Sequence, residues 1–89
     1  MHFEWNPAKA VGNVGKHGVA FEEACTVFGD PLSATQENHF GSEARFITVG
    51  YSATGRLLLV VHADRADAIR IISARPATAA ERRRHEQSI

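Results

Sequence analysis

The chain has 89 residues, 44% of them hydrophobic and 22% charged, which predicts one globular domain and excludes a disordered or fibrous protein. No apolar run approaches the roughly 20 residues that span a bilayer, and the N-terminus has no signal-peptide pattern. The single cysteine excludes an internal disulfide and fits a reducing compartment, so we expect a cytoplasmic protein without membrane contact.

The net charge is zero, but the two halves of the chain differ in sign. Residues 1–55 carry three Lys or Arg against six Asp or Glu, whereas residues 56–89 carry seven against four. All seven cations of the second half are arginines, whose planar guanidinium suits bidentate contacts with phosphate. A basic face that only meets solvent would carry the same charges, so charge alone leaves both interpretations open.

The chain begins with a predicted edge strand and a helix. Phe3 to Trp5 alternates as a short strand does. A helix over Ala8 to Lys16 is favoured by Asn6 as the cap and Pro7 at the first helical position. Gly18 supplies the left-handed residue that ends this helix.

Two apolar helix faces are expected in the first half. The first helix places Ala10, Val11 and Val14 on one face. The second helix, from about Ala20 to Phe28, carries an apolar stripe at helical spacing that includes Cys25. Both helices are therefore expected to cover one face of a sheet.

The second half predicts a sheet and a closing helix. Residues 32–44 are polar without a clear period; they allow a short strand such as Leu32 to Thr35, followed by a loop. The strands expected after them cover Arg45 to Tyr51, about 55–64 and 68–75. Thr78 and Glu81 form a capping-box pattern that opens a helix through about Gln87. This order predicts an α+β domain, an antiparallel meander packed by two N-terminal helices and followed by a C-terminal helix.

A register follows if each hairpin closes around a four-residue loop. Tyr51 would then face Arg56, and Ala63 would face Ala68. This register sets His62 beside Arg45, on the same face as Arg75. Arg70 would lie on the other face unless the strand bulges.

No metal or cofactor is expected, because the histidines are far apart in sequence and no Cys-x-x-Cys or Gly-rich loop is present. Cys25 is interpreted as a core residue. His62 is the leading acid–base candidate, since imidazole titrates near neutrality; the alternative, which the position favours, is a hydrogen-bonded residue at a strand end. His17, beside Lys16, either contributes to a site or only favours the end of its helix.

Three consecutive arginines lie in the expected C-terminal helix. Arg82, Arg83 and Arg84 could contact phosphate or form a solvated helix face, and His85 could reach a groove or meet solvent. Several arginines near a histidine suit one reaction without metal. RNA carries its own nucleophile, and a protein can cleave it by stabilising the phosphate charge and moving protons.

The chain resembles the BrnT toxin family in motifs that follow one another along nearly its whole length. They are Phe3-Glu4-Trp5-Asn6, Lys16-His17-Gly18-Val19-x-Phe21-Glu22-Glu23-Ala24, Val27-Phe28-x-Asp30-Pro31, Gly55-Arg56 and Arg70-Ile71-Ile72-Ser73-Ala74-Arg75, followed by Thr78 and Glu81-Arg82. The chain departs from the family at His85, where many members carry Tyr.

The resemblance implies a RelE-like ribonuclease toxin of a type II toxin–antitoxin pair, which inhibits translation by cleaving RNA. It also implies a BrnA-like ribbon-helix-helix antitoxin, which forms a hetero-oligomer with the toxin and alone contacts operator DNA. The expected catalytic residues are Arg70, Arg75, His62 and His17, and the expected RNA-binding residues are Lys16, Arg45, Arg56, Arg82 and Arg83. The alternative is a RelE-like binding module without catalysis that serves as antitoxin partner and corepressor.

Overall fold

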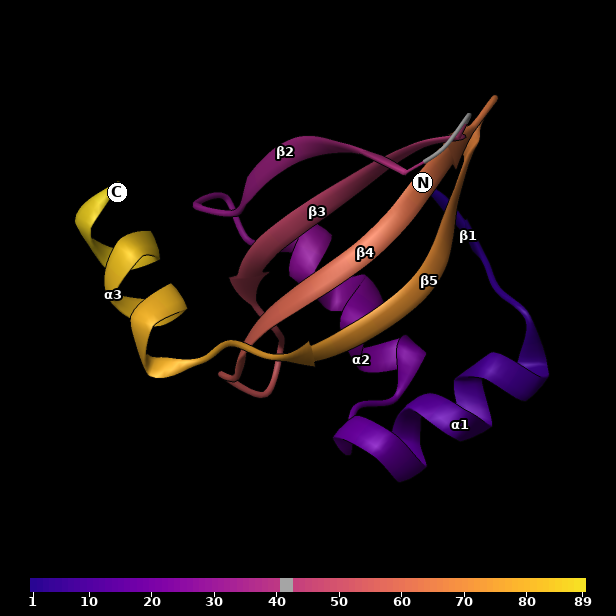
Figure 1. The fold of residues 1–89 in the computed structure, drawn as a ribbon, viewed down its shortest axis with the longest axis horizontal. Helices are drawn as coiled ribbons and strands as arrows, with labels where there is room; N and C mark the ends of the chain where they lie inside the picture. Colours follow the sequence, from indigo (N-terminus) through magenta and orange to yellow (C-terminus); the bar gives the residue numbers. More distant parts are fainter. Residues whose placement is uncertain (41–42) are drawn as a thin grey trace.

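The computed structural model describes residues 1–40 and 43–89. These residues form one five-stranded sheet with three α-helices and a short 3-10 helix, η1 (Figure 1). The elements follow in this order: β1 (His2–Glu4), α1 (Pro7–His17), α2 (Phe21–Thr26), η1 (Val27–Gly29), β2 (Ala34–Phe40), β3 (Glu43–Tyr51), β4 (Leu57–Arg65), β5 (Ala68–Pro76) and α3 (Ala79–Gln87).

The strands lie in the order β1-β5-β4-β3-β2. Strands β2 to β5 form an antiparallel meander, and β1 pairs with β5 in parallel. The expected α+β class is confirmed, but the expectation of a purely antiparallel sheet is wrong at β1. The first strand reaches the sheet edge beside the last strand and runs in the same direction, so the sheet is mixed.

The helix ends follow their local signals. The Asn6 side chain accepts hydrogen bonds from the backbone N–H groups of Ala8 and Lys9, and Gly18 ends α1 with φ of 69°. Thr78 and Glu81 form the predicted capping box at the start of α3. The predicted second helix is shorter than expected, because its last residues continue as η1.

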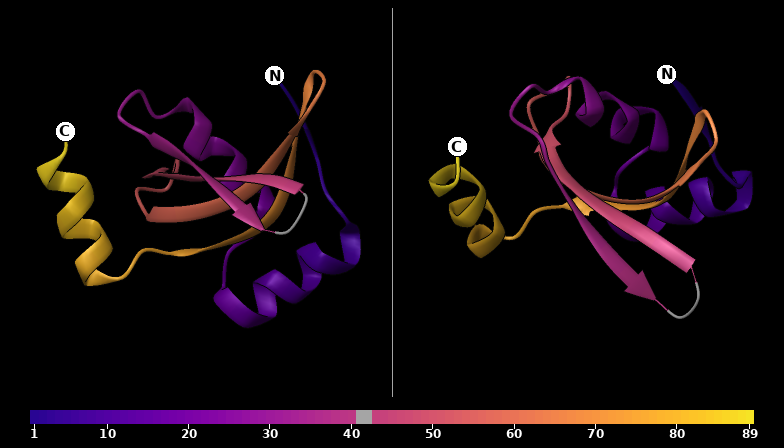
Figure 2. Two further views of the ribbon diagram at one scale, coloured as in Figure 1. Left: turned by 45° about the horizontal axis from the view of Figure 1, so that its top comes forward. Right: turned by 90° about the horizontal axis from the view of Figure 1, so that it is seen from above.

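The core lies between the sheet and the two N-terminal helices. Its buried residues come from the α2 region, with Val19, Phe21, Ala24 and Val27, and from the strands, with Leu58, Val60, Ile71 and Ala74. Both α1 and α2 pack against β5, whereas α3 stands apart from them on the other side of the molecule (Figures 1 and 2). One face of the sheet is therefore covered and the other is largely open.

The predicted apolar face of α1 is wrong at its two valines, whereas its third residue, Ala10, packs against the core. Val11 is 75% exposed and Val14 is 50% exposed, whereas Asn13 is buried. The Asn13 amide donates to the carbonyl oxygen of Ala74 at 2.8 Å and accepts from the Ala74 N–H at 3.2 Å. Because β1 pairs only with the start of β5, the later edge of β5 needs such a partner. This requirement turns Asn13, rather than the valines, toward the sheet.

β2 is longer than the predicted strand at Leu32 to Thr35. It begins at Ala34, extends to Phe40 and pairs with β3 along its length. Pairing at the sheet edge stabilises this polar segment, which has no apolar period of its own. The remainder of the predicted loop, at 41–42, lies outside the described residues.

Both predicted hairpin registers are wrong. Tyr51 pairs with Leu57, so the loop between them has five residues, including Gly55 with the expected positive φ of 86°. At the next hairpin Arg65 pairs with Ala68, which leaves a two-residue turn in which Ala66 has φ of 49°. The first change shifts the pairing by one residue and exchanges the faces of β4 relative to β3, whereas the second shifts it by two residues and keeps them.

Candidate functional site

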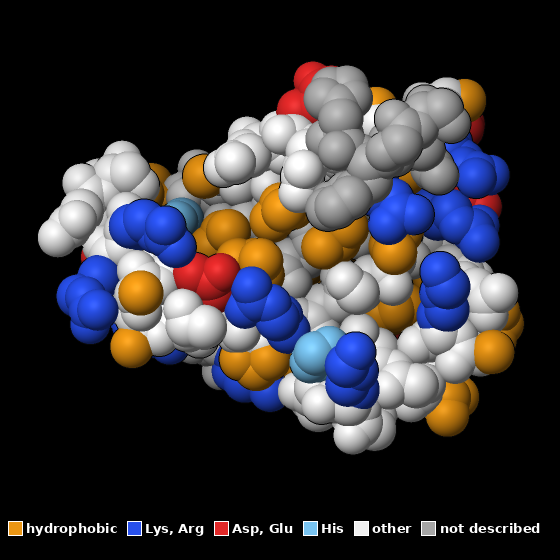
Figure 3. All heavy atoms as spheres, in the orientation of Figure 1, with side chains coloured by type: hydrophobic (Ala, Val, Ile, Leu, Met, Phe, Trp, Pro, Cys, Tyr) orange, Lys and Arg blue, Asp and Glu red, His pale blue; other side chains and the backbone are white. Residues whose placement is uncertain are grey.

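The face of the sheet opposite α1 and α2, called the open face below, carries three cross-strand rows. The first row is Ala34–Val49–Leu59–Arg75, and the second is Gln36–Ile47–Val61–Ser73. In the third, Asn38 pairs with Arg45, and Ala63 pairs with Arg70. Figure 3 shows this face with hydrophobic side chains at its centre and Lys or Arg side chains around them. The open face is an apolar band between arginines.

A β-bulge in β5 brings Arg70 onto the same face as Arg75. Val61 pairs with Ser73, but the next residue, His62, pairs with Ile71. An extra residue thus lies between these pairs in β5. In a regular strand, residues five apart point to opposite faces, and one extra residue reverses this relation. The sequence predicted Arg70 on the other face unless the strand bulged, and this bulge is present.

Arg45 and Arg70 lie at one end of the open face. Their strands are separated by β4, which places their backbones about 10 Å apart. The Arg70 side chain is 32% exposed, and its Nη1 lies 3.7 Å from Glu4 Oε2. The Nε of Arg45 is buried and has no hydrogen-bond partner among the described residues. An anion bound at this end could accept that hydrogen bond.

Arg75 lies at the other end and is held by Glu81 of α3. Its Nη1 and Nη2 donate to the two carboxylate oxygens of Glu81 at 2.8 and 2.9 Å. Hydrogen bonds from Arg75, followed by one from the Thr78 backbone, hold the pKa of Glu81 at about 2. The carboxylate is therefore ionised at neutral pH, and the pair fixes the direction of the guanidinium.

His62 is not beside Arg45, and this part of the prediction is wrong. The side chain is 3% exposed and lies on the covered face. Its ring packs on Phe28 and Phe46, with centroid distances of 4.9 and 5.7 Å. Because the first hairpin loop has five residues rather than four, His62 pairs with Phe46 and points away from the open face.

The two ring nitrogens of His62 are both occupied. Nε2 lies 2.8 Å from Thr48 Oγ1, and Nδ1 lies 3.0 Å from Asp64 Oδ1. Burial lowers the pKa of the imidazole, and Asp64 partly opposes this effect. A neutral ring that donates from Nδ1 to Asp64 and accepts at Nε2 from Thr48 satisfies both contacts. This burial leaves His62 without direct access to a substrate on the open face.

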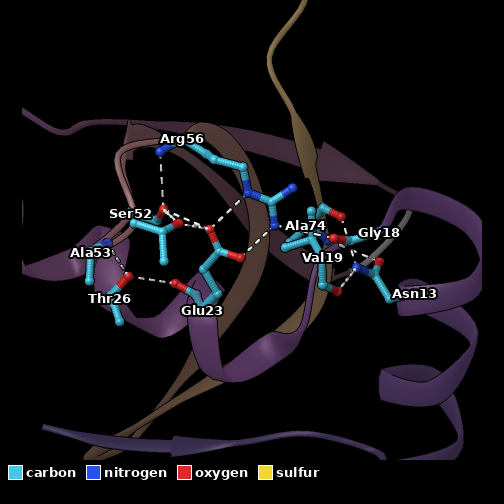
Figure 4. A network of polar contacts seen from close by, with 10 residues as sticks. Asn13, Gly18, Val19, Glu23, Thr26, Ser52, Ala53, Arg56 and Ala74 are labelled. Atoms are coloured by element: carbon cyan, nitrogen blue, oxygen red, sulfur yellow. Dashed lines mark hydrogen bonds and ion pairs between the residues drawn. The ribbon is translucent and has the colours of Figure 1, made fainter.

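Arg56, which was predicted to bind RNA, forms several contacts within the fold. Its Nε donates to Glu23 Oε2 at 3.0 Å, and its Nη2 contacts Glu23 Oε1 and the carbonyl oxygen of Gly18 (Figure 4). Ser52 and Thr54 donate to the same carboxylate. Hydrogen bonding by Arg56 is the largest cause that lowers the pKa of Glu23 to about 2. Arg56 ties the β3–β4 loop to α2, and its guanidinium is engaged within the fold.

The other predicted cations lie on helices α1 and α3. Lys16 is exposed and His17 half-buried in the last turn of α1, next to the turn that Asn13 fastens to β5. Arg82 and Arg83 are exposed on α3. These four residues thus lie on helices rather than in the cross-strand rows of the open face.

A cleft of about 490 Å³ separates α3 from the open face. Its sheet wall contains Ala34, Thr35, Gln36, Ile47, Val49 and Leu59, and its helix wall contains Glu81, Arg84, His85 and Ser88. The helix residues recur at i, i+3, i+4 and i+7 from Glu81, a spacing that puts them on one face. Sequence reasoning did not single out this face, although the capping box had already fixed the start of the helix.

His85 is buried in the wall of this cleft rather than solvated. It is 5% exposed, its ring lies 6.2 Å from that of Tyr51, and its Nε2 has no hydrogen-bond partner among the described residues. Arg84, its neighbour, is exposed. Arg84 thus adds a cation to the cleft lining, and His85 adds an imidazole whose buried Nε2 the described residues leave unpartnered.

Cys25 packs against the core, as expected. Burial, followed by the charge of Glu22, raises the pKa of its thiol to about 11, so it is protonated at neutral pH and a poor nucleophile. In the described part of the chain, no group of three or more His, Cys, Asp or Glu could hold a metal ion. No helix there is long and apolar enough to cross a membrane.

The fold is similar to a solved structure, the ribonuclease toxin BrnT of Brucella abortus. The TM-score is 0.66 at 20% sequence identity, and the match covers 88% of this chain and 97% of the Brucella chain. At 20% identity this similarity shows that the two proteins share a fold. A search of curated proteins gave no match.

The sequence also matches a family model across most of its length. The model describes BrnT, the ribonuclease toxin of type II toxin–antitoxin systems, and it matches residues 5–81. This range includes the bulged strand β5, the first turn of α3 and Arg45 of β3. The chain belongs to the BrnT family of ribonuclease toxins of type II toxin–antitoxin systems.

Proposed function

We propose that this chain is a metal-independent endoribonuclease toxin that cleaves RNA on the open face and so inhibits translation. One observation carries the proposal: in a chain of this family, Arg45, Arg70 and Arg75 share one largely uncovered face of the sheet. The similarly folded Brucella protein is also described as a ribonuclease toxin. The apolar band between the arginines suits the ribose and base portions of a single strand.

The reaction needs charge stabilisation and two proton transfers. The 2′-hydroxyl oxygen attacks the adjacent phosphorus and loses its proton to a base. The P–O5′ bond breaks, and the departing 5′ oxygen takes up a proton. The products are a 2′,3′-cyclic phosphate and a 5′-hydroxyl. Guanidinium groups stabilise the negative charge that develops on the phosphate oxygens.

Arg75 has donors left for this role despite its ion pair. Nη1 donates to Glu81 and to the Pro76 carbonyl oxygen, and Nη2 donates once to Glu81. A guanidinium carries five N–H groups, so Nε and one hydrogen on Nη2 remain. These two lie along one edge and can form a bidentate contact with phosphate. In this proposal Glu81 orients Arg75, and Arg70 binds a second phosphate with assistance from Arg45.

His17 is the proton-transfer group in this proposal. It is half-buried as the last residue of α1, four residues after Asn13, which donates to the carbonyl oxygen of Ala74, the neighbour of Arg75 in β5. Histidine is the side chain that most often serves as general acid or base in enzymes. His62, although predicted as the leading group, is buried on the other face. Lys16, Arg82 and Arg83 would contact further phosphates and orient the strand.

The partner in this proposal is a BrnA-like ribbon-helix-helix antitoxin. Membership of a type II family implies an antitoxin, and the half-exposed residues Ile47, Val49, Leu59 and Val61 offer it an apolar surface. Binding there would cover the arginines and stop cleavage. In the resulting hetero-oligomer only the antitoxin would contact operator DNA.

Cleavage of RNA by the purified toxin in excess EDTA tests the enzymatic proposal. We expect Arg70→Gln and Arg75→Gln each to lower the cleavage rate about 100-fold, because each removes a donor that stabilises the transition state. His17→Gln should also lower the rate, because it removes the group assigned to proton transfer. The matched control is Arg65→Gln, an exposed arginine at the β4–β5 turn.

Two outcomes would contradict the proposal. Intact RNA after incubation with folded wild-type toxin would favour a binding module without catalysis. Cleavage by both arginine variants at the wild-type rate would remove the open face from the reaction. Thermal melting of each variant separates a loss of activity from a loss of fold, which matters for Arg75 because it also anchors Glu81.

A further inference from the structure

The cleft under α3 has the size and lining of a site for a small planar ligand. Ligand pockets commonly have volumes of about 300–1,000 Å³ with mostly apolar walls and a few placed polar groups. The cleft has a volume of about 490 Å³, and Ile47, Val49 and Leu59 form its apolar wall. Gln36 and Ser88 add groups that both donate and accept hydrogen bonds.

His85 supplies a polar atom that the fold itself does not use. The residue is 5% exposed, and its Nε2 lacks a partner among the described residues. Buried polar side-chain atoms are usually hydrogen-bonded, so an unpartnered one needs an explanation. A ligand in the cleft that presents a hydrogen-bonding edge would provide the missing partner.

The cleft is also joined to the proposed phosphate site. Leu59 of the cleft wall pairs directly with Arg75, so their backbones are about 5 Å apart. Glu81 and Arg84 belong to the helix wall, and Arg75 neutralises Glu81. Arg84 is therefore the cation in the cleft whose charge is left for a ligand. Within one nucleotide the base and its phosphate are separated by a single ribose, which matches this arrangement.

We propose that the cleft holds a nucleobase of the RNA strand while Arg75 binds the phosphate of the same nucleotide. The base lies against Ile47, Val49 and Leu59, and His85 forms a hydrogen bond with its edge. His85 thus determines base preference rather than the chemical step. This inference rests on the proposed function, since it identifies how the same face selects its substrate.

The inference is tested with nucleotides rather than with cleavage. Binding of AMP, GMP, CMP and UMP is compared with that of ribose 5-phosphate, which has the phosphate and sugar but no base. The readouts are calorimetry and the methyl shifts of Ile47, Val49 and Leu59. We expect at least one nucleotide to bind about tenfold more tightly than ribose 5-phosphate and to shift those methyl signals.

His85→Phe is the informative variant, because it keeps an aromatic ring beside Tyr51 and removes both ring nitrogens. It should reduce the preference among the four nucleotides about tenfold while binding of ribose 5-phosphate is unchanged. Leu59→Trp fills the cleft. It should weaken binding of the nucleotides without changing the affinity for ribose 5-phosphate. Glu86→Gln, an exposed neighbour on α3, is the control.

Several results would overturn the inference. One is that all four nucleotides bind no better than ribose 5-phosphate; another is that His85→Phe retains the wild-type preference. A response of the cleft methyl groups to the antitoxin but to none of the nucleotides would assign the cleft to a protein side chain instead. RNA cleavage in EDTA with the same cut sites in wild type and His85→Phe would refute base reading and leave the ribonuclease intact. Nucleotide binding in the cleft without any RNA cleavage would support the base site and refute the enzyme.

Discussion

The imidazole of His62 belongs to a chain of hydrogen bonds that crosses three strands. Thr35 Oγ1 lies 2.7 Å from Thr48 Oγ1, which lies 2.8 Å from His62 Nε2, and Asp64 holds the other nitrogen. The sequence pattern identified a polar residue at the end of an apolar strand. Only its neighbours show that the hydrogen bonds stabilise the sheet on its covered face.

This environment predicts a pH dependence of stability. Because burial lowers the pKa of His62 in the folded state, the unfolded chain takes up a proton first as pH falls. The contribution of His62 is therefore complete above its usual pKa of about 6.5 and decreases as pH drops toward the lower folded value. We expect the melting temperature to fall between about pH 7 and pH 5.

His62→Gln should show less of this decrease and should unfold about 2 kcal/mol more easily at pH 7, because buried partners lose hydrogen bonds. Its RNA cleavage should keep the wild-type pH profile. His2→Gln, an exposed histidine, is the control for both measurements. If folded His62→Gln instead loses the pH dependence of RNA cleavage near neutrality, His62 would be assigned to proton transfer after all.

Among the helices, α3 depends most on a few specific contacts for its attachment to the sheet. It is joined to the body by the Arg75–Glu81 ion pair and by the packing of His85 on Tyr51, and most of its other side chains are exposed. Glu81 has two roles, since it also accepts from the Thr78 backbone N–H at 2.8 Å. The cap and the attachment of the helix are therefore coupled through one carboxylate.

Thr78→Ala tests this coupling. Loss of the cap should cost about 1 kcal/mol, and we expect the amides of α3 to exchange about fivefold faster, with no comparable change in β4. If the cleft binds a nucleobase as proposed, Thr78→Ala should also lower the affinity for nucleotides, because α3 forms one wall of the cleft. Glu86→Ala on the same helix is the comparison, and equal exchange in the two variants would show that the capping box does not hold α3.

At the scale of the whole molecule, the two faces of the sheet differ: one builds the core and the other stays largely open. One face packs on the two N-terminal helices, and the other presents the apolar band and its arginines. A half-exposed apolar band on a small domain is typical of an interaction surface. This division lets Arg70 and Arg75 interrupt an apolar strand while their side chains stay partly exposed and paired with Glu4 and Glu81.

The antitoxin proposal belongs to this scale. Expression of the chain alone should arrest growth, and coexpression of a BrnA-like antitoxin should restore it. Arg75→Gln should remove the arrest, whereas Val61→Asp on the apolar band should prevent copurification with the antitoxin. Normal growth of cells that contain folded wild-type chain would favour the non-catalytic binding module.

Much of the local structure could be predicted because its causes are local. Asn6, Gly18 and Thr78 fix helix ends through hydrogen bonds or a left-handed backbone within a few residues. The strands β3, β4 and β5 are rich in residues that favour the extended conformation. The arginines of β5 were also identified from sequence, together with the condition under which Arg70 could join the site.

The rest depends on contacts between residues distant in the sequence. Asn13 turns α1 because it satisfies Ala74, 61 residues away. β2 forms because β3 is available to pair with it. His85 is buried because α3 folds back toward Tyr51, a position that neither its helix pattern nor its charged neighbours indicate.

The sequence alone determined the α+β class, the order of elements, the helix caps and the arginine-rich motifs of the family. The tertiary structure decided which of those residues share a face. One extra residue in the β3–β4 loop and one bulge in β5 moved His62 to the covered face and Arg70 to the open face. The physical reason is the two-residue period of a strand: a shift of one residue exchanges the two faces, and only the pairing between strands sets that shift.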